Sequence, residues 1–335
     1  MRITALAGGI GGARFLRGLL THLNETGGPG AHQVTVIGNT GDDVTLHGLR
    51  VCPDLDTVMY TLGGGIHEEQ GWGRTDETFT IAEELEAYGS EPRWFTLGDR
   101  DFATHIVRTR MLGTGAGLDE VTAALCRRWG FEALGVRLLP MSNDRVETHV
   151  VVRDRNDPEG QALRTIHFQE WWVRLHAAVP AERILAVGIE QATPAPGVIE
   201  AITEADVVLL PPSNPVVSIG TIISVPGVRE ALRATTAPVV GVSPIIGTAP
   251  VRGMADACLT AIGVETSPAA VAGLYADFLG GWLVAEKDLP EVDGPRQPYP
   301  EGVAVVGRPL LMDDVPATAA IAAAALELAE SLRGE

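Results

Sequence analysis

The chain has 335 residues, of which 45% are hydrophobic, and its 43 acidic and 25 basic residues give a formal net charge of −18. This length and apolar content suffice for one large α/β domain, or for such a core with a smaller insert. The negative charge argues against nucleic acid or an anionic membrane as the main partner, because neither would be attracted.

Two further features of the sequence bear on location. The N-terminal apolar run is broken by glycines, unlike the core of a signal peptide, and no run approaches the roughly 20 apolar residues that span a bilayer. The three cysteines, Cys52, Cys126 and Cys258, are far apart and have no metal-binding spacing. We therefore expect a protein of the reducing cytoplasm, without a membrane segment.

The first predicted elements are a strand over 3–7, a glycine turn over 8–12 and a helix that follows it. The turn reads Gly8-Gly9-Ile10-Gly11-Gly12. A strand, a glycine loop and a helix N-terminus together present backbone N–H groups to an anion, usually phosphate. The dinucleotide-binding pattern is incomplete, because Arg14 occupies the third glycine position. Two interpretations stay open: a phosphate site, or a tight turn without a ligand.

A second strand, over 34–37, ends in a loop that carries several carboxylates. The loop reads Gly38-Asn39-Thr40-Gly41-Asp42-Asp43, and Asp54 and Asp56 follow in the segment Pro53-Asp54-Leu55-Asp56-Thr57. Clustered carboxylates repel one another unless a cation, helix N-termini or solvent offsets the repulsion. Ligands that are all oxygen atoms favour a hard cation such as Mg²⁺ over zinc.

Residues 68–130 favour helices over strands, and we expect helices over 78–88, 104–111 and 118–129. This segment is a predicted helical insert between the two parts of the core, 1–67 and 131–335. It contains Leu97-Gly98-Asp99-Arg100-Asp101. Asp101 is a candidate N-cap, and Arg100 between two acids suits either a capping network or a phosphate oxygen. His105 is interpreted as a residue of the helix face, and a catalytic base is the open alternative.

The segment 134–168 predicts antiparallel strands over 136–139, 146–152 and 163–168, with a turn over 154–160. Between the first two strands lies Pro140-Met141-Ser142-Asn143-Asp144, a polar turn. The adjacent Trp171 and Trp172 are typical of core packing, and a planar ligand stacked on them is the open alternative.

The last part resumes alternating strands and helices, with strands over 184–189, 207–210 and 239–242 and a terminal helix over 317–332. Two of these strands end in loops rich in Ser, Pro and Gly, over 211–218 and 243–247. In a doubly wound sheet such loops meet the glycine turn at one edge, where ligands bind; plain turns are the alternative. The pattern predicts an α/β fold, a Rossmann-like three-layer doubly wound mostly parallel sheet with a small inserted helical domain.

Several of these segments, taken together, resemble the motifs of the 2-phospho-L-lactate transferases. The matching segments run in order along nearly the whole chain: Gly8–Gly12, Asn39–Asp43, Pro53–Val58, Leu97–Asp101, Thr104-His105, Pro140–Ser142, Pro212–Pro215, Ser218–Gly220 and Ser243–Gly247. The alanine- and arginine-rich sequence is most similar to the actinobacterial branch, which uses a phosphoenolpyruvyl donor.

The resemblance implies a step in the biosynthesis of the deazaflavin coenzyme F-420. A guanosine diphosphate ester would give its phosphoenolpyruvyl or 2-phospho-L-lactyl unit to the ribityl hydroxyl of 7,8-didemethyl-8-hydroxy-5-deazariboflavin, and GMP would leave. The resemblance further implies Mg²⁺, a homodimer and two small-molecule substrates, the deazaflavin acceptor and the guanosine diphosphate-linked donor.

Residue by residue, the resemblance implies catalytic roles for Asp43, Asp54 and Asp56, with Asp43 and Asp54 as the metal ligands or the base. It associates Asp56 and Arg100 with the deazaflavin, and the glycine turn and the loops at Ser213 and Ser243 with the guanosine diphosphate. The substrate-binding candidates are Gly9, Gly11, Gly12, Asn39, Thr40, Asp56, Asp99, Arg100, Met141, Ser142, Ser213, Asn214, Ser218, Ser243 and Gly247.

Two other functions remain as alternatives to the transferase. A nucleotide-binding regulatory protein of the same fold would bind a nucleotide and have no affinity for the deazaflavin. A dinucleotide oxidoreductase is disfavoured by the missing third glycine and by Gly38-Asn39 in place of the acid that binds ribose.

Overall fold

The computed structural model describes residues 1–28, 30–154, 157, 162–290 and 299–334. Its centre is a seven-stranded sheet in which all neighbouring strands are parallel. In spatial order the strands are β14 (Ala304–Gly307), β13 (Gly281–Val284), β10 (Val239–Val242), β9 (Val207–Leu210), β1 (Arg2–Ala7), β2 (Gln33–Gly38) and β5 (Val136–Pro140). On one side of β1 lie β2 and β5, and on its other side lie β9, β10, β13 and β14, which come later in the chain. The direction in which strands are added therefore reverses between β1 and β9. This is the doubly wound arrangement that the sequence predicts.

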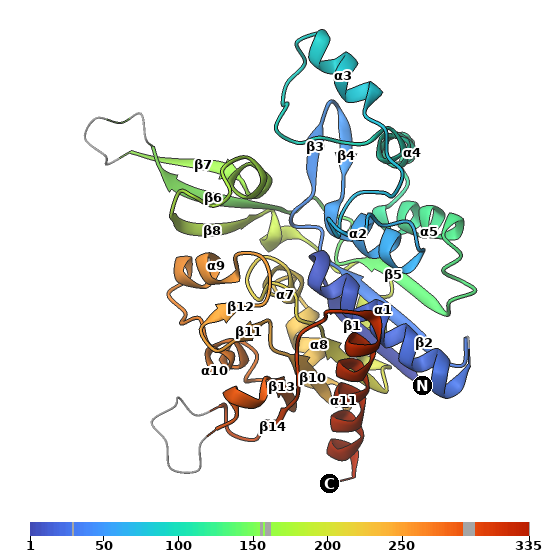
Figure 1. Ribbon diagram of the computed structural model, residues 1–335, viewed down its shortest axis with the longest axis vertical. Helices are drawn as coiled ribbons and strands as arrows, with labels where there is room; N and C mark the ends of the chain where they lie inside the picture. The colour runs from blue at the N-terminus through green and yellow to red at the C-terminus, as the bar shows by residue number, and fades with distance from the viewer. Residues whose placement is uncertain (29, 155–156, 158–161, 291–298, 335) are drawn as a thin grey trace.

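Helices cover both faces of the parallel sheet and form a three-layer structure (Figure 1). One hydrophobic cluster lies under α1 (Gly9–Gly27), α2 (Pro53–Leu62), α5 (Leu118–Arg128) and α11 (Val315–Arg333). The other lies under α6 (Val198–Thr203), α7 (Ile219–Ile223), α8 (Val228–Ala234), α9 (Ala255–Ala261) and α10 (Pro268–Gly273). Contrary to the expectation that no run approaches a membrane span, α11 has the length and apolarity of one, alone among the described residues, but half of that apolar window is buried inside the protein. It packs beside α1 as a core helix (Figure 1).

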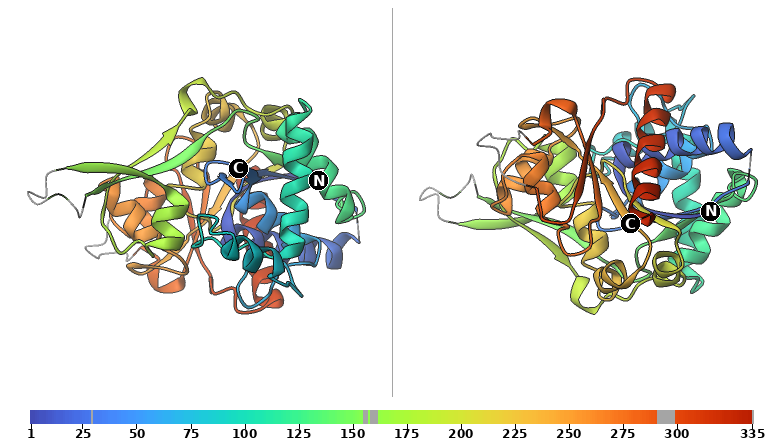
Figure 2. Two further views of the ribbon diagram at one scale, coloured as in Figure 1. Left: turned by 90° about the horizontal axis from the view of Figure 1, so that it is seen from above. Right: turned by 90° about the horizontal axis from the view of Figure 1, so that it is seen from below.

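A second, antiparallel sheet projects from the side of the first, as the views from above and below show (Figure 2). It consists of β7 (Leu163–His167), β6 (Glu147–Arg153) and β8 (Ala181–Val187), and the short helix η1 (Glu170–Arg174) follows β7. Trp171 is fully buried in the core of this sheet, and its Nε1–H donates to the Val179 carbonyl at 2.7 Å. Core packing is therefore the observed role of this tryptophan.

Two strand predictions are wrong in detail. The strand over 136–139 was expected in the antiparallel group, but it is β5 and pairs parallel with β2. Its residues are buried except Arg137, which is typical of a parallel strand covered on both faces. The strand expected over 184–189 is β8, and it pairs antiparallel with β6 rather than joining the parallel sheet. Most of the predicted turn over 154–160 lies outside the described residues.

The helices predicted within 68–130 are present as α3 (Thr80–Ala87), α4 (Asp99–Gly113) and α5. A separate hydrophobic cluster joins Leu97 and Phe102 to the hairpin of β3 (Val44–Leu46) and β4 (Leu49–Val51). By contrast, Leu118 and Cys126 of α5 belong to the core beneath α1. The division of the chain into a core and an insert stays a prediction. The remaining short elements are η2 (Ile189–Gln191), β11 (Ile245–Ile246), β12 (Ala249–Pro250) and η3 (Glu286–Asp288).

Candidate functional site

The glycine turn after β1 lies against the loop that follows β9. The Ser213 hydroxyl donates to the Gly8 carbonyl at 2.8 Å and accepts from the Gly8 N–H at 3.2 Å. A Cβ atom at Gly12 would lie 2.5 Å from Ser213 Oγ, and a Cβ atom at Gly11 would collide with the Pro212 carbonyl. The close approach therefore requires glycine and brings two of the predicted loops together.

Asp54, in the first turn of α2, lies at this junction. Asn39, from the loop after β2, donates through Nδ2 to Asp54 Oδ2 at 2.9 Å and to the Val217 carbonyl at 3.1 Å. Burial raises the pKa of Asp54 to about 6, although hydrogen bonds from Asn39 and from the Gly9 backbone act in the opposite direction. The loops after β1, β2 and β9 thus meet at one carboxylate, at the place where the strand order reverses.

Asp42 and Asp43 are both buried beside this junction. Burial, followed by repulsion from Asp54, raises the pKa of Asp42 well above its usual value. Burial also raises the pKa of Asp43 to about 7, although the charge of Arg50 lowers it. Arg50 Nη2 lies 3.1 Å from Asp43 Oδ2. With a pKa of about 7, the Asp43 carboxyl group binds a proton near neutral pH and is therefore able to exchange it with a substrate.

Asp56, the fourth buried carboxylate, is paired with basic residues of α4. Arg108 Nη2 donates to Asp56 Oδ1, and His105 Nδ1 lies 3.7 Å from Asp56 Oδ2. Burial lowers the pKa of Arg108, but attraction to Asp56 outweighs it and raises that pKa. The sequence analysis assigned no role to Arg108. The signal was present, because Asp101, His105 and Arg108 recur at a spacing that places them on one face of α4.

Several buried oxygen atoms of the site make no hydrogen bond within the protein. They are Thr40 Oγ1, Asp42 Oδ1, Asp43 Oδ1, Asp43 Oδ2 and Asp56 Oδ2. An unsatisfied buried oxygen is costly, so these atoms suit a bound ligand or cation. Because all are hard oxygen donors, they fit Mg²⁺. Asp42 therefore joins Asp43 and Asp54 as a candidate ligand, and its position next to Asp43 was the available signal.

Asp99 and Arg100 have their side-chain hydrogen bonds and ion pairs with residues 75–81, outside this cluster. The Asp99 carboxylate accepts from the backbone N–H groups of Thr80 at 3.2 Å and Ile81 at 2.9 Å, and so caps α3. The prediction that Asp101 is the N-cap of α4 is wrong: Gly98 holds that position, and Asp101 accepts from the Tyr60 hydroxyl at 2.7 Å.

Of the remaining predicted residues, Ser218 lies at the glycine turn, where its Oγ would be 2.8 Å from a Cβ on Gly8. The others have local structural contacts. Met141 is buried in the core, and the Ser142 hydroxyl donates to the Thr193 carbonyl at 2.6 Å. The Asn214 side chain accepts from the Val216 N–H at 2.9 Å, the Ser243 hydroxyl donates to the Ile245 carbonyl at 2.7 Å, and Gly247 takes a positive φ of 66°. Their roles toward a substrate stay predictions.

Comparison with known proteins agrees with this geometry. The model of the family described as "2-phospho-L-lactate transferase CofD" matches residues 3–302. The chain is 63% identical to the phosphoenolpyruvate transferase of Kitasatospora aureofaciens over 334 residues, which cover 99% of each chain. It is 62% identical to that of Thermobifida fusca and 54% identical to that of Mycolicibacterium smegmatis, each aligned over 98% or more of both chains.

Among solved structures, a protein of the UPF0052 family from Bacillus halodurans is similar to this chain. Its TM-score is 0.60 at 17% identity, with 97% of this chain and 98% of that chain covered. At this identity the similarity supports the α/β fold alone. The family match and the high identity over full length establish more: this chain belongs to the 2-phospho-L-lactate transferase family and is a transferase.

Proposed function

We propose that this transferase moves a phosphoenolpyruvyl group from its guanosine diphosphate ester to the ribityl hydroxyl of 7,8-didemethyl-8-hydroxy-5-deazariboflavin, a step of coenzyme F-420 biosynthesis. The observation that carries the proposal is the junction of a glycine turn with buried carboxylates, several of whose oxygen atoms make no hydrogen bond among the described residues. The names of the most similar relatives favour phosphoenolpyruvyl over 2-phospho-L-lactyl as the group transferred.

The chemistry is substitution at phosphorus. The ribityl oxygen attacks the phosphorus that carries the enolpyruvyl group, and a new P–O bond forms. The bond from that phosphorus to the bridging oxygen breaks, and GMP leaves with the electron pair. The hydroxyl proton goes to a carboxylate, for which Asp43 is suited because its pKa of about 7 lets it accept a proton near neutral pH.

The protein also has to bind the diphosphate. The backbone N–H groups of the glycine turn and the N-terminus of α1 attract phosphate oxygens, because their partial charges are positive. Asp42 and Asp54 would hold Mg²⁺, which when bound would neutralise charge on the diphosphate, while Asp43 serves as the base. The homodimer implied by the resemblance and the cytoplasmic location expected from the cysteine content remain parts of this proposal.

The test is a reconstituted reaction of the purified protein with the deazaflavin, the guanosine diphosphate ester and Mg²⁺, in which GMP and the coupled deazaflavin are quantified by mass spectrometry. We expect both products from the natural chain and at least about a 100-fold loss in Asp43→Asn, because one positioned base contributes that much. Asp313→Asn is the matched control, because Asp313 is exposed. If GDP binds but the deazaflavin neither binds nor reacts, the regulatory alternative holds.

A further inference from the structure

We propose that His167 and Gln169, together with the β6 backbone at Thr148, are positioning residues that hold Asp42 and Asp43 for the transfer reaction. We call residues 39–43 the carboxylate loop. The inference rests on the proposed function, because it assigns the antiparallel sheet a role in that reaction: the sheet would fix the direction in which the two carboxylates point.

Three consecutive carbonyl groups of the carboxylate loop are held by this part of the chain. The Gly41 carbonyl accepts from the Thr148 N–H at 2.5 Å. The Asp42 carbonyl accepts from Gln169 Nε2 at 3.1 Å, and the Asp43 carbonyl lies 3.1 Å from His167 Nε2. Thr148 belongs to β6, His167 to β7, and Gln169 to the helical segment that follows β7. Because the three donors come from different residues, the loop cannot rotate without breaking several hydrogen bonds at once.

Two N–H groups of the loop are satisfied from inside it. Gly41 donates to the Asn39 side chain at 2.9 Å, and Asp43 donates to the Thr40 carbonyl at 3.3 Å. The backbone is therefore fully paired at Gly41 and Asp43, whereas Asp43 Oδ1 has no hydrogen-bond partner among the described residues and Asp43 Oδ2 has the ion pair with Arg50 at 3.1 Å. A rigid backbone that carries unsatisfied side-chain atoms is the arrangement expected of a preorganised site.

The hydrogen bonds of His167 determine which of its ring nitrogens carries the proton. The Gln169 N–H donates to His167 Nδ1 at 3.0 Å, so Nδ1 is the acceptor and Nε2 carries the hydrogen. The Nε2–H group is then the donor to the Asp43 carbonyl. A neutral histidine suffices for this role, and burial lowers the pKa of His167, which favours the neutral form.

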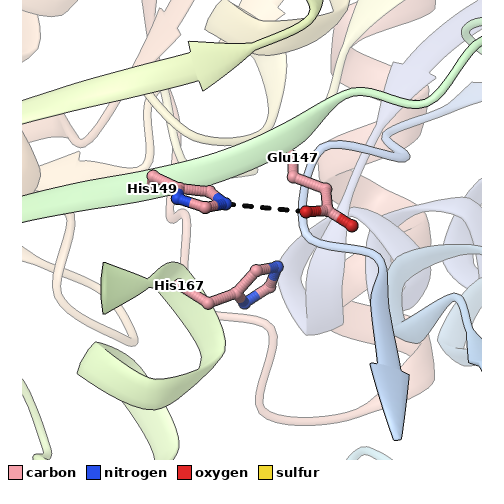
Figure 3. A group of neighbouring side chains, drawn as sticks. All are labelled: Glu147, His149 and His167. Atoms are coloured by element: carbon pink, nitrogen blue, oxygen red, sulfur yellow. Dashed lines mark ion pairs between the residues drawn. The ribbon is translucent and has the colours of Figure 1, made fainter. Parts of the chain in front are cut away.

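Glu147, His149 and His167 lie together beside the loop (Figure 3), with one ligand atom of each within 4.8 Å of the others. We do not interpret them as a metal site, because both ring nitrogens of His167 already have partners. Glu147 Oε1 is also held by two arginines, Arg145 Nη2 at 2.6 Å and Arg50 Nη1 at 3.4 Å. Arg50 also lies 3.1 Å from Asp43. Glu147 of the antiparallel sheet is therefore linked through Arg50 to the Asp43 side chain, in addition to the hydrogen bonds that the sheet makes with the loop backbone.

The experiment removes one donor at a time. Gln169→Met deletes the side-chain N–H at similar volume, and His167→Met does the same for the ring donor. Ile166→Val is the matched control, because Ile166 is a buried core residue of β7 with no side-chain donor or acceptor. His167→Gln retains an N–H donor and tests whether activity is rescued. The measurements are kcat and KM for both substrates, and hydrogen–deuterium exchange of the peptide that covers the carboxylate loop.

We expect kcat to fall by about 10- to 100-fold in the two methionine variants, because small displacements of catalytic groups have effects of this size. KM should change by less than about 3-fold, which indicates an interaction that acts on the transition state. Exchange of the loop should rise in both variants, His167→Gln should recover part of kcat, and Ile166→Val should leave kcat and loop exchange unchanged.

Unchanged loop exchange in both methionine variants would overturn the inference, and so would faster exchange with kcat preserved. An inactive natural chain would instead contradict the proposed function. The exchange measurement would still decide whether His167 and Gln169 hold the carboxylate loop, so the two failures are distinguishable.

Discussion

At the scale of single residues, the unusual feature of this protein is buried charge. Asp42, Asp43, Asp54 and Asp56 are all less than 10% exposed, and Arg108 is 2% exposed. Burying a charge is costly unless a partner or a bound ion offsets the cost. Asp56 has its partner in Arg108, whereas Asp42 has no ion pair among the described residues. We infer that Asp56 and Arg108 form a fixed pair and that Asp42, together with the Asp43 oxygen that is not paired with Arg50, is kept for a ligand.

Replacement of Arg108 tests the fixed pair. Arg108→Met should lower the free energy of unfolding by about 3–5 kcal/mol, because it leaves the Asp56 carboxylate buried without its partner. The double variant Arg108→Met/Asp56→Leu should recover part of this loss, because the charge that lost its partner is also gone. Urea denaturation measures both. A loss below about 1 kcal/mol in Arg108→Met would show that Asp56 does not depend on this pair.

The raised carboxyl pKa values predict how stability depends on pH. With pKa values of about 7 for Asp43 and about 6 for Asp54, the folded protein holds protons that the unfolded chain, near 3.8, has released. The free energy of unfolding in EDTA should therefore fall as the pH rises from about 4 to about 7. Asp43→Asn should flatten this dependence, as followed by urea denaturation at pH 5 and pH 8. An equally steep fall in the variant would contradict the raised pKa.

At the scale of elements, glycines set the distance between α1 and the loop after β9. Gly11 faces the Pro212 carbonyl, which is backbone and cannot move aside as a side chain can. The sequence predicts the strand, the turn and the helix at this place. It could not distinguish a ligand site from a tight turn, because the reason for the glycines lies in a loop some 200 residues away in the chain.

Gly11→Ala should lower the free energy of unfolding by about 1–3 kcal/mol, the usual effect of a methyl group forced into a packed contact. Gly113→Ala is the matched control. Gly113 lies at the end of α4, and a Cβ atom added there would have nothing within 4 Å, so this variant should be neutral or slightly stabilising. Thermal unfolding compares the two. Equal midpoints would show that the α1 contact tolerates a side chain.

At the scale of the whole molecule, α11 closes the core. Its buried residues include Ile321 and Leu326, which belong to the same cluster as Phe15 and Leu16 of α1. Gly18 of α1 permits the close approach, because a Cβ atom there would lie 2.5 Å from the Thr318 side chain. The C-terminal helix is thus a part of the layer over the parallel sheet, far in sequence from the strands that it covers.

A chain that ends before Val315 should be insoluble, or should lack a cooperative unfolding transition, because it exposes the apolar face under α11. A chain that ends at Arg333 keeps the helix and should unfold like the full protein. Soluble expression and circular dichroism with heating provide the comparison. Cooperative unfolding of the shorter chain would show that the core does not need α11.

The sequence by itself determined the α/β class, the glycine turn and the carboxylate loop, because periodicity and turn chemistry are local properties of the chain. It also carried the family resemblance, which rests on ordered motifs. Only the tertiary structure decided that β5 joins the parallel sheet and that β8 does not, because a strand takes its partners from distant segments. It alone separated Asp56, paired with Arg108, from Asp42, which has no ion pair among the described residues, since the direction and the partner of a carboxylate depend on contacts that no local pattern encodes.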